Sequence, residues 1–311
     1  MHLQTTAARA ATLLRKNPAL FCRLILAKLN TTRPMPSLPA RKHIRDVVFE
    51  CDLRGYRGTA PMYFGSYAML VVDAMKRLLK PGDTFIDVGA NVGYLSAVAA
   101  GLVGTHGEVH SFEPVPVYFA KLRRLAELNP EFPIHANSCA AGEIAGAFPI
   151  YVTQEPGQNT LVPSYKTGSE IVETVEVPVI RLDAYIAARN LRRVSLIKID
   201  AEGFELPILK GLQGYFESTD HRPAIICEIA PRAYPLLGRS LWELAAFMAG
   251  YGYFARDLID GTTRVDLCAM RQVEDVLFRP GACDLSDKHS SGPKSVASSE
   301  LETPHFRGGH S

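Results

Sequence analysis

The feature that most constrains this chain is the segment Thr-Phe-Ile-Asp-Val-Gly-Ala-Asn-Val-Gly at positions 84–93. Its first half is apolar apart from Asp87, as expected for a buried β-strand. Gly89 and Gly93 then allow another group to approach the backbone closely. The apolar run 94–102 predicts a helix immediately after the turn. A strand, a glycine turn and a helix form the unit with which open α/β sheets hold nucleotide-like ligands.

This glycine turn differs from the dinucleotide-binding fingerprint, which has the spacing G-x-G-x-x-G. Here Ala90 and Asn91 follow Gly89, and Asp87 precedes it. A carboxylate at that place would repel a pyrophosphate but attract an ammonium or a sulfonium group. The spacing D-x-G-x-N-x-G resembles motif I of the class I S-adenosylmethionine-dependent methyltransferases. The alternative is a turn that only connects a strand to a helix.

A second acid follows at the spacing of a nucleotide fold. Residues 108–113 are predicted to form a strand that ends at Glu113, which lies 20 residues after Gly93. In such folds a carboxylate at the end of the second strand accepts hydrogen bonds from ribose hydroxyls. The alternative is a solvated carboxylate at a strand end. Together with the glycine turn, Glu113 favours an adenosine-containing ligand.

A third group of acids follows a predicted strand at 194–199. Asp200, Glu202 and Glu205 surround Gly203 at the carboxyl end of this strand. Three carboxylates are costly to bury without partners, so they indicate a polar cleft. The alternative is the first turn of a helix, where acids interact favourably with the helix dipole. That alternative explains Asp200 less well than it explains Glu202 and Glu205.

Four segments in this order resemble the FkbM family of methyltransferases: Phe-Ile-Asp-Val-Gly-Ala-Asn-Val-Gly, Ser-Phe-Glu-Pro, Lys-Ile-Asp-Ala-Glu-Gly-Phe-Glu and Pro-Ala-Ile-Ile-Cys-Glu-Ile. They span residues 84–229, and the likeness extends to about residue 279. The resemblance implies an α/β fold with the class I methyltransferase, Rossmann-like sheet. This sheet is mostly parallel with an antiparallel last strand, and helices flank it.

The resemblance also implies S-adenosyl-L-methionine as the cofactor. It places Asp87, Gly89, Asn91 and Gly93 around the methionine part, Glu113 at the ribose, and Asn137 and Ser138 near the adenine. Residues 137 and 138 precede Ala140, which falls where the family has a small residue after the third strand.

The activity implied by the resemblance is O-methylation of a hydroxyl on a sugar or glycan, a glycolipid or a secondary metabolite. Such a hydroxyl is a poor nucleophile, so removal of its proton in the transition state would help. The candidate bases are Asp200, Glu202, Glu205 and Glu228, of which Glu202 or Asp200 is favoured. Lys198 is expected to share a strand face with Asp200 and to pair with an acid.

No resident metal is expected, because isolated acids are a weak metal pattern. A divalent cation between these carboxylates, as in some catechol methyltransferases, is the alternative. Two other functions compete with methyl transfer: a cofactor-binding interaction protein without catalysis, and an NAD-dependent oxidoreductase, whose fingerprint is broken here.

Charge is distributed unevenly along the chain. Residues 1–45 carry nine Lys or Arg and no acid, whereas residues 46–311 carry 25 basic and 32 acidic side chains. The acidic body disfavours nucleic acid as a partner. Asn17-Pro18 predicts a helix that runs to about Leu29. This basic helix would dock on the body, lie on an anionic membrane surface or act as a transit peptide.

Three domains are expected from these patterns: a basic helical extension and linker (1–45), the methyltransferase domain (46–283) and a disordered, serine-rich tail (284–311). Six scattered cysteines without a C-x-x-C pair favour a reducing, cytoplasmic setting. The oligomeric state does not follow from these patterns.

An insertion is expected between the third and fourth strands. Residues 148–152 and 172–180 are predicted β segments, and they bracket the polar stretch 153–169. This stretch would act as a lid, form part of the acceptor site or be a disordered hairpin tip. Strands at 224–229, 253–258 and 265–270 are expected to complete the main sheet, with a helix at 241–248 between the first two.

Overall fold

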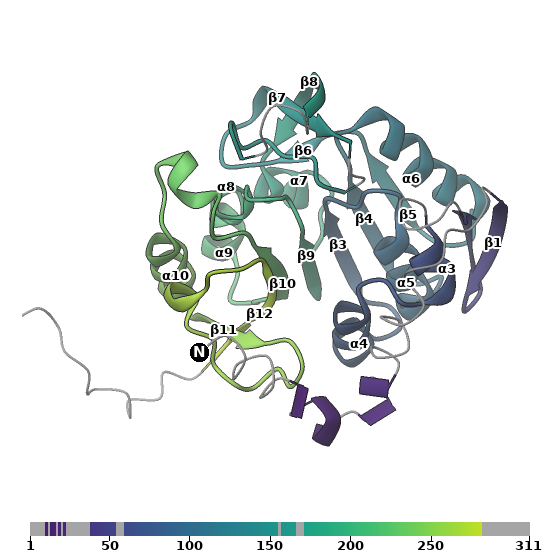
Figure 1. Ribbon diagram of the computed structural model, residues 1–311, viewed down its shortest axis with the longest axis horizontal. Coiled ribbons are helices and arrows are strands. Elements are labelled where there is room, and N and C mark those ends of the chain that lie inside the picture. The colour runs from purple at the N-terminus through teal and green to yellow at the C-terminus, as the bar shows by residue number, and fades with distance from the viewer. Residues whose placement is uncertain are drawn as a thin grey trace, which may run out of the picture.

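The structure is a computed structural model of the 311-residue chain. It describes residues 10–22 except 12, 17 and 20, and residues 38–53, 59–154, 157–165 and 171–281 (Figure 1). The predicted disordered tail at 284–311 lies outside the described residues, as does most of the predicted helix at 17–29.

A seven-stranded sheet forms the centre of the described chain. Its order is β11 (Tyr253–Asp257), β12 (Glu274–Pro280), β10 (Ala224–Ile229), β9 (Leu196–Ile199), β3 (Thr84–Val88), β4 (Glu108–Phe112) and β5 (Ile134–Asn137). The five strands from β10 to β5 are parallel to their neighbours, whereas β12 runs antiparallel to both β10 and β11. The expected mostly parallel sheet with an antiparallel last strand is therefore confirmed.

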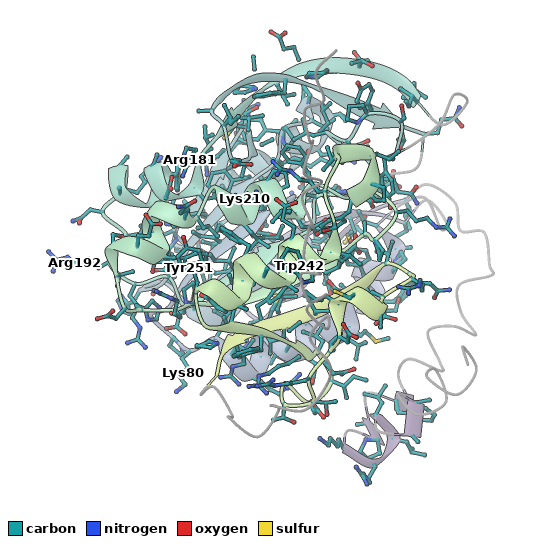
Figure 2. The ribbon with its side chains drawn as sticks, turned by 90° about the vertical axis from the view of Figure 1, so that its left-hand side faces the viewer. Lys80, Arg181, Arg192, Lys210, Trp242 and Tyr251 are labelled. Carbon is teal, nitrogen blue, oxygen red and sulfur yellow. The ribbon has the colours of Figure 1, made fainter. Side chains whose placement is uncertain are left out.

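Helices cover both faces of this sheet and form two separate cores. One face is covered by α4 (Met69–Leu78), α5 (Tyr94–Val103) and α6 (Pro116–Leu128). The other is covered by α7 (Leu182–Ala188), α8 (Glu205–Lys210), α9 (Gln213–Ser218) and α10 (Leu241–Gly250). Because both faces are buried, the central strands are nearly continuous apolar runs rather than alternating ones. Figure 2 shows α10 from outside, with the labelled Trp242 on its outer face, where it is 70% exposed.

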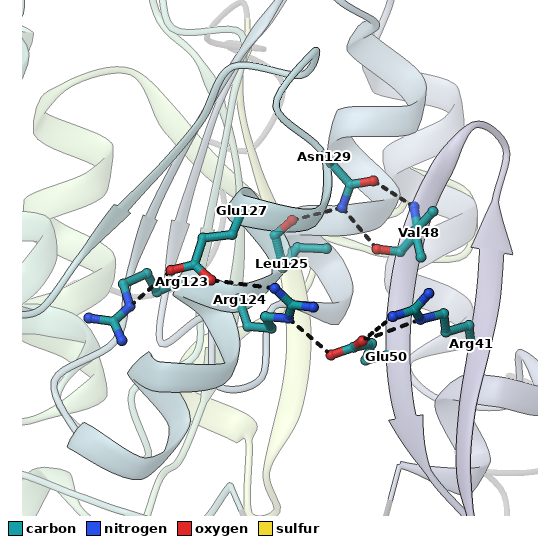
Figure 3. Close-up of polar contacts among 8 residues, drawn as sticks. All are labelled: Arg41, Val48, Glu50, Arg123, Arg124, Leu125, Glu127 and Asn129. Carbon is teal, nitrogen blue, oxygen red and sulfur yellow. Dashed lines mark hydrogen bonds and ion pairs between the residues drawn. The ribbon is translucent and has the colours of Figure 1, made fainter.

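A hairpin that the sequence did not predict precedes the sheet. Strand β1 (Pro39–Ile44) pairs with β2 (Val47–Asp52), so the hairpin spans the predicted domain boundary at residue 45. The short helix α3 (Ala60–Phe64) follows. The hairpin is fixed to the end of α6 by Asn129, whose side chain accepts a hydrogen bond from Val48 N at 2.7 Å and donates one to Val48 O at 2.9 Å (Figure 3).

The predicted insertion forms a small sheet above the carboxyl ends of the main strands (Figure 1). It consists of β6 (Ala140–Ala141), β7 (Gly146–Thr153) and β8 (Ile171–Ile180), in the order β6-β8-β7. The two predicted β segments of the insertion are confirmed. Five residues of its tip, 166–170, lie outside the described residues.

One predicted strand is wrong. Residues 265–270 form no strand of the sheet; Leu267–Ala269 is a single 3₁₀ turn, labelled η3. The Asp266 side chain accepts a hydrogen bond from Cys268 N at 2.9 Å, and this local bond favours a turn over an extended strand. The last strand is β12 instead.

The described part of the N-terminal segment contacts the body. Leu13 is buried against Met69, and Lys16 Nζ lies 2.9 Å from Asp260 Oδ2. Among the described residues, we find no helix with the length and hydrophobicity needed to cross a bilayer.

Candidate active site

A narrow cleft lies where the carboxyl ends of β3, β4 and β9 meet. Three of its walls come from the regions that the sequence analysis identified: the turn after β3, the end of β4 and the acidic loop after β9, which is residues 200–205. The insertion supplies the fourth. The lining residues are Tyr67, Val88, Gly89, Asn91, Phe112, Glu113, Pro114, Ala140, Ala141, Ile150, Gly157, Asn159, Leu161, Asp200, Ala201, Glu202 and Ile208.

Gly89 joins the glycine turn to the acidic loop. Its φ is +79°, and a Cβ at this position would lie only 1.8 Å from the carbonyl oxygen of Asp200. No side chain therefore fits there. The backbone of Asp200 also donates a hydrogen bond to Val88 O at 3.0 Å. Gly89 and Asp200 are 111 residues apart in the sequence, and the two motifs to which they belong are thus held in direct contact by the absence of a side chain.

Glu113 lines the cleft at the end of β4, as the resemblance implies for a ribose-binding acid. It accepts hydrogen bonds from Asn91 N and Val115 N, both at 2.8 Å. Burial raises the pKa of Glu113 to about 7, although these two bonds lower it. Each carboxylate oxygen accepts more than one hydrogen bond, so both retain capacity for a ligand hydroxyl.

Asp87 and Gly93 lie behind the cleft rather than in its wall. Asp87 is fully buried and accepts a hydrogen bond from Ser96 Oγ at 2.6 Å. Burial raises the pKa of Asp87 to about 6. Gly93 precedes α5 with φ +84°, and a Cβ there would press on Leu125. In this structure both residues support the turn, and their predicted contact with a cofactor remains a prediction.

Asn137 and Ser138, predicted near the adenine, are also absent from the cleft wall. The Asn137 amide donates to Ser111 O at 3.1 Å and to His135 O at 3.0 Å, which fixes it within the sheet. Ala140 and Ala141, immediately after them, line the cleft instead. Small side chains there leave room for a flat ligand.

Two acids of the cleft wall, Asp200 and Glu202, lie beside a third acid, Glu228, which does not line the cleft. Carboxylate oxygens of Asp200, Glu202 and Glu228 all lie within 4.8 Å of one another. We call these three residues the acidic group. Lys198 lies beneath it, with its Nζ 3.4 Å from Asp200 Oδ2 and 3.5 Å from Asp275 Oδ1. The predicted pairing of Lys198 with Asp200 is confirmed.

The closeness of these acids shifts the pKa values of Glu228 and of the neighbouring Lys198. Burial, followed by the charge of Asp200, raises the pKa of Glu228 to about 10, so Glu228 is protonated at neutral pH. Burial would lower the pKa of Lys198, but the charges of Asp200 and Asp275 outweigh it and raise that pKa. Lys198 therefore keeps its charge at every pH at which the protein would be assayed.

Glu205, the fourth candidate base, does not reach the cleft. It is fully buried, and its Oε1 accepts a hydrogen bond from Gly203 N at 2.7 Å. Burial raises the pKa of Glu205 to about 7. Its side chain faces the buried Tyr234 hydroxyl from below the acidic loop. This placement favours a structural role for Glu205.

The insertion closes over the acidic loop through Thr160. This residue is 1% exposed, and its hydroxyl donates to the carbonyl oxygen of Glu202 at 2.7 Å while accepting from Val162 N at 3.0 Å. Glu202 has φ +48°, a left-handed conformation that is strained for a residue with a side chain. Thr160 therefore helps hold the acidic loop in an unfavourable conformation.

Two tyrosines and one acid near the acidic group were not identified from the sequence as site residues. Tyr67, just before α4, lines the cleft, and burial and the charge of Asp200 raise its pKa. Tyr165 lies in the insertion, where burial and Glu202 raise its pKa to about 12. Asp275 arrives on β12 opposite Glu228.

The cleft is small in this structure. Its enclosed volume is about 80 Å³, against roughly 300–1,000 Å³ for ligand pockets in general. Gly157, Asn159 and Leu161 of the insertion line it, and a nucleoside-sized ligand requires more room than this conformation leaves. A larger hollow of about 760 Å³ lies between the β1–β2 hairpin and α6. Of the glycine turn after β3, only Val92 lines that hollow.

Two sets of described side chains have the spacing of metal ligands. One is the acidic group. The other consists of Glu108, His110 and His135 on the face of β4 and β5 that α7 covers. In the second set the imidazole rings of His110 and His135 are stacked, 4.6 Å apart, and His110 already bonds Glu108 and Tyr185. The ring nitrogens of His110 are therefore already used in hydrogen bonds within the protein.

Comparison with known proteins agrees with this geometry. The family model described as "Methyltransferase FkbM domain" matches residues 87–255, more than half of the chain. The chain is 29% identical over 166 residues to Methyltransferase 1 of Beauveria bassiana, covering 48% of this chain and 66% of that protein.

Two further relatives have names that state more. One is 31-O-demethyl-FK506 methyltransferase FkbM of Streptomyces tacrolimicus, 29% identical over 205 residues, covering 56% of this chain and 74% of the relative. The other is Hexuronic acid methyltransferase AglP of Haloferax volcanii, 25% identical over 154 residues, covering 48% and 59%. The matches thus span roughly three fifths to three quarters of these relatives' lengths. With its seven-stranded sheet and the family model matched from Asp87 to Ala255, this chain belongs to the FkbM family of methyltransferases.

Proposed function

We propose that this protein transfers a methyl group from S-adenosylmethionine to a hydroxyl group of a sugar, a glycolipid or a secondary metabolite. The observation that carries the proposal is the close approach of Gly89 to Asp200, which brings the glycine turn together with Asp200 and Glu202 in one cleft. The name of the Streptomyces relative, a 31-O-demethyl-FK506 methyltransferase, supports a hydroxyl acceptor, and the name of the Haloferax relative, a hexuronic acid methyltransferase, supports a sugar as the acceptor molecule.

The residues present fit this cofactor by their chemistry. Glu113 offers carboxylate oxygens to a ribose, Ala140 and Ala141 leave space for a flat base, and the carboxylate of Asp200 attracts a sulfonium. The cofactor supplies an activated methyl group when bound. The protein aligns the acceptor oxygen with that group and takes up the acceptor's proton.

We assign proton uptake to Glu202 and positioning to Asp200. Lys198 Nζ lies 3.4 Å from Asp200 Oδ2, and this ion pair holds the Asp200 carboxylate in place. Glu202 lines the same cleft and is held there by the hydrogen bond from Thr160 to its carbonyl oxygen. Glu228 is protonated at neutral pH, so it cannot accept a proton there.

The test combines cofactor binding with methyl transfer. Calorimetric titration with S-adenosylmethionine measures binding, and radiolabel from its methyl group is followed into glycan and lipid extracts. Replacing Glu202 by glutamine should lower transfer by about 100-fold or more while the cofactor Kd changes by less than about twofold. Glu131→Gln, on an exposed residue away from the cleft, is the matched control.

Three results would count against the proposal. Tight binding of a nicotinamide cofactor in place of S-adenosylmethionine would favour an oxidoreductase. Binding of S-adenosylmethionine without transfer to any extract would favour a cofactor-binding interaction protein. Undiminished transfer by Glu202→Gln would remove Glu202 from the mechanism.

A further inference from the structure

We propose that Glu108, His110 and His135 form a binding site for a divalent transition-metal ion of the zinc class. The three residues lie on β4 and β5, on the face of the main sheet that α7 covers. They are separate from the cleft, because Glu108 begins β4 whereas Glu113 follows its end. Metal binding here is therefore independent of the proposed methyl transfer.

Strand geometry brings the three side chains together. His110 and His135 are register partners on the neighbouring parallel strands β4 and β5. Glu108 lies two residues before His110, and side chains two residues apart in a strand point to the same face of a sheet. One ligand atom of each residue lies within 4.8 Å of the other two. Two imidazoles and a carboxylate therefore converge on one point near the edge of the sheet.

The contact between Glu108 and His110 already has nearly the spacing of two ligands on one ion. His110 Nε2 lies 2.9 Å from Glu108 Oε2. Two ligand atoms at about 2.0–2.1 Å from a tetrahedral zinc ion are about 3.3 Å apart. These two side chains therefore have to separate by only about 0.4 Å to admit the ion.

Tyr185 on α7 supplies the outer contact that a ligating histidine needs. Its hydroxyl lies 2.9 Å from His110 Nδ1, and its ring packs edge-on against the imidazole, with centroids 5.6 Å apart. A histidine that binds a metal through one nitrogen usually donates a hydrogen bond from the other. A phenol hydroxyl can accept that bond or donate one. Tyr185 can therefore hold His110 in the tautomer that donates from Nε2 to Glu108 and in the tautomer that leaves Nε2 free for a metal.

His135 is the ligand that has to move. Its ring is partly exposed and is stacked on that of His110 at a centroid distance of 4.6 Å. No residue in the described part of the chain forms a hydrogen bond with its ring nitrogens. A turn of this ring breaks no described hydrogen bond, so it can bring a nitrogen closer to Glu108 and His110.

The donor atoms select the class of metal. Imidazole nitrogens suit zinc, nickel and copper, whereas magnesium and calcium prefer sites made of oxygen atoms. The Glu108 side chain is 45% exposed, which gives the ion a path from solvent and leaves room for a water as a further ligand. The site therefore fits a zinc-like ion better than magnesium or calcium.

One nearby cation opposes metal binding. The guanidinium of Arg189 lies over the Tyr185 ring, 5.4 Å from its centroid. Burial lowers the pKa of His110 and His135, and the charge of Arg189 lowers it further. The same charge repels a metal ion, so removing it should strengthen binding.

The test measures zinc binding by the full chain after treatment with a chelator. In competition with a chromophoric zinc indicator, we expect a micromolar or lower Kd, and saturating zinc should raise the Tm by about 5 °C. The X-ray absorption spectrum of the bound zinc should show nitrogen and oxygen ligands at about 2.0–2.1 Å and no sulfur at about 2.3 Å, which excludes the cysteines. Magnesium in about 100-fold excess should not displace the zinc.

Variants assign the ion to these residues. His135→Gln and Glu108→Gln should each weaken zinc binding by at least about tenfold, and Arg189→Gln should strengthen it. His43→Gln, at an exposed histidine on β1, is the control and should leave the Kd unchanged. Circular dichroism checks that every variant folds.

Three results would overturn the proposal. The first is the absence of zinc binding at about 100 µM, a concentration well above the expected Kd. The second is zinc binding that His135→Gln leaves unchanged, which would place the ion elsewhere on the chain. The third is zinc binding that Glu202→Gln abolishes, which would assign the ion to the acidic group instead.

Discussion

Replacing Glu228 by glutamine is expected to stabilise the protein by an amount that grows with pH. Glu228 is half-buried beside Asp200, and desolvation together with the charge of Asp200 raises its pKa from 4.5 to about 10 on folding. Between these values the folded chain binds a proton that the unfolded chain has released. Rising pH therefore favours unfolding. Glutamine binds no proton in either state and is free of this penalty.

The magnitude follows from one proton. Each pH unit inside the window changes the free energy of unfolding by about 1.4 kcal/mol. Between pH 5.5 and pH 8, Glu228→Gln should gain about 3 kcal/mol relative to the natural chain. Below pH 4.5 the two proteins should respond to pH alike.

The assay is urea unfolding followed by circular dichroism at pH 5.5, 6.5, 7.5 and 8. The difference between variant and natural chain is plotted against pH. Glu131→Gln serves as the control, since its residue is exposed and the same plot should be flat. A flat plot for Glu228→Gln would refute the reasoning. A variant that became less stable with rising pH would show that Glu228 is ionised and paired with Lys198.

Two further substitutions test how the cleft is held together. Gly89→Ala should prevent folding or abolish cofactor binding, because its Cβ would meet Asp200 O. The control is Gly252→Ala, which has the same φ of +79° but no atom within 4 Å of the added Cβ, and it should cost only about 1 kcal/mol of stability. Equal losses of stability in thermal unfolding would contradict the contact argument. Thr160→Val should lose about 2 kcal/mol of stability, one for each hydrogen bond, and lower methyl transfer because Glu202 is released. Thr160→Ser should restore both, and full transfer by the valine variant would exclude positioning.

The parts of the fold that the sequence predicted are those where one physical effect dominates. Strands β3 and β10 are buried on both faces and therefore read as short apolar runs between turns. Strand β12 was missed because Glu274, Asp275 and Arg279 flank an apolar centre of only three residues. Strand β1 was missed for a related reason. None of its residues is fully buried, so it carries no apolar run.

The candidate site divides in the same way. Acids at the ends of parallel strands were predicted to meet because the topology brings those ends to one edge. Asp275 was missed because it enters from an antiparallel strand, at the beginning of β12 rather than at its end. The contact between Thr160 and Glu202 depends on the fold of the insertion, and no local sequence pattern in residues 153–165 predicts it.

Several features of this cleft oppose stability, and they lie where the chemistry is proposed. Asn91 and Glu202 have positive φ, which costs about 1–3 kcal/mol for each residue, and Glu228 is kept from ionising. Two large cores on either side of the sheet offset these costs. If the strain serves only the fold, Glu228→Gln should raise stability and leave methyl transfer intact. If it serves the acceptor, the same variant should be more stable at pH 8 and transfer less. Measuring both the stability and the methyl transfer of Glu228→Gln therefore shows whether the destabilising carboxyl group at residue 228 serves the function or is only tolerated.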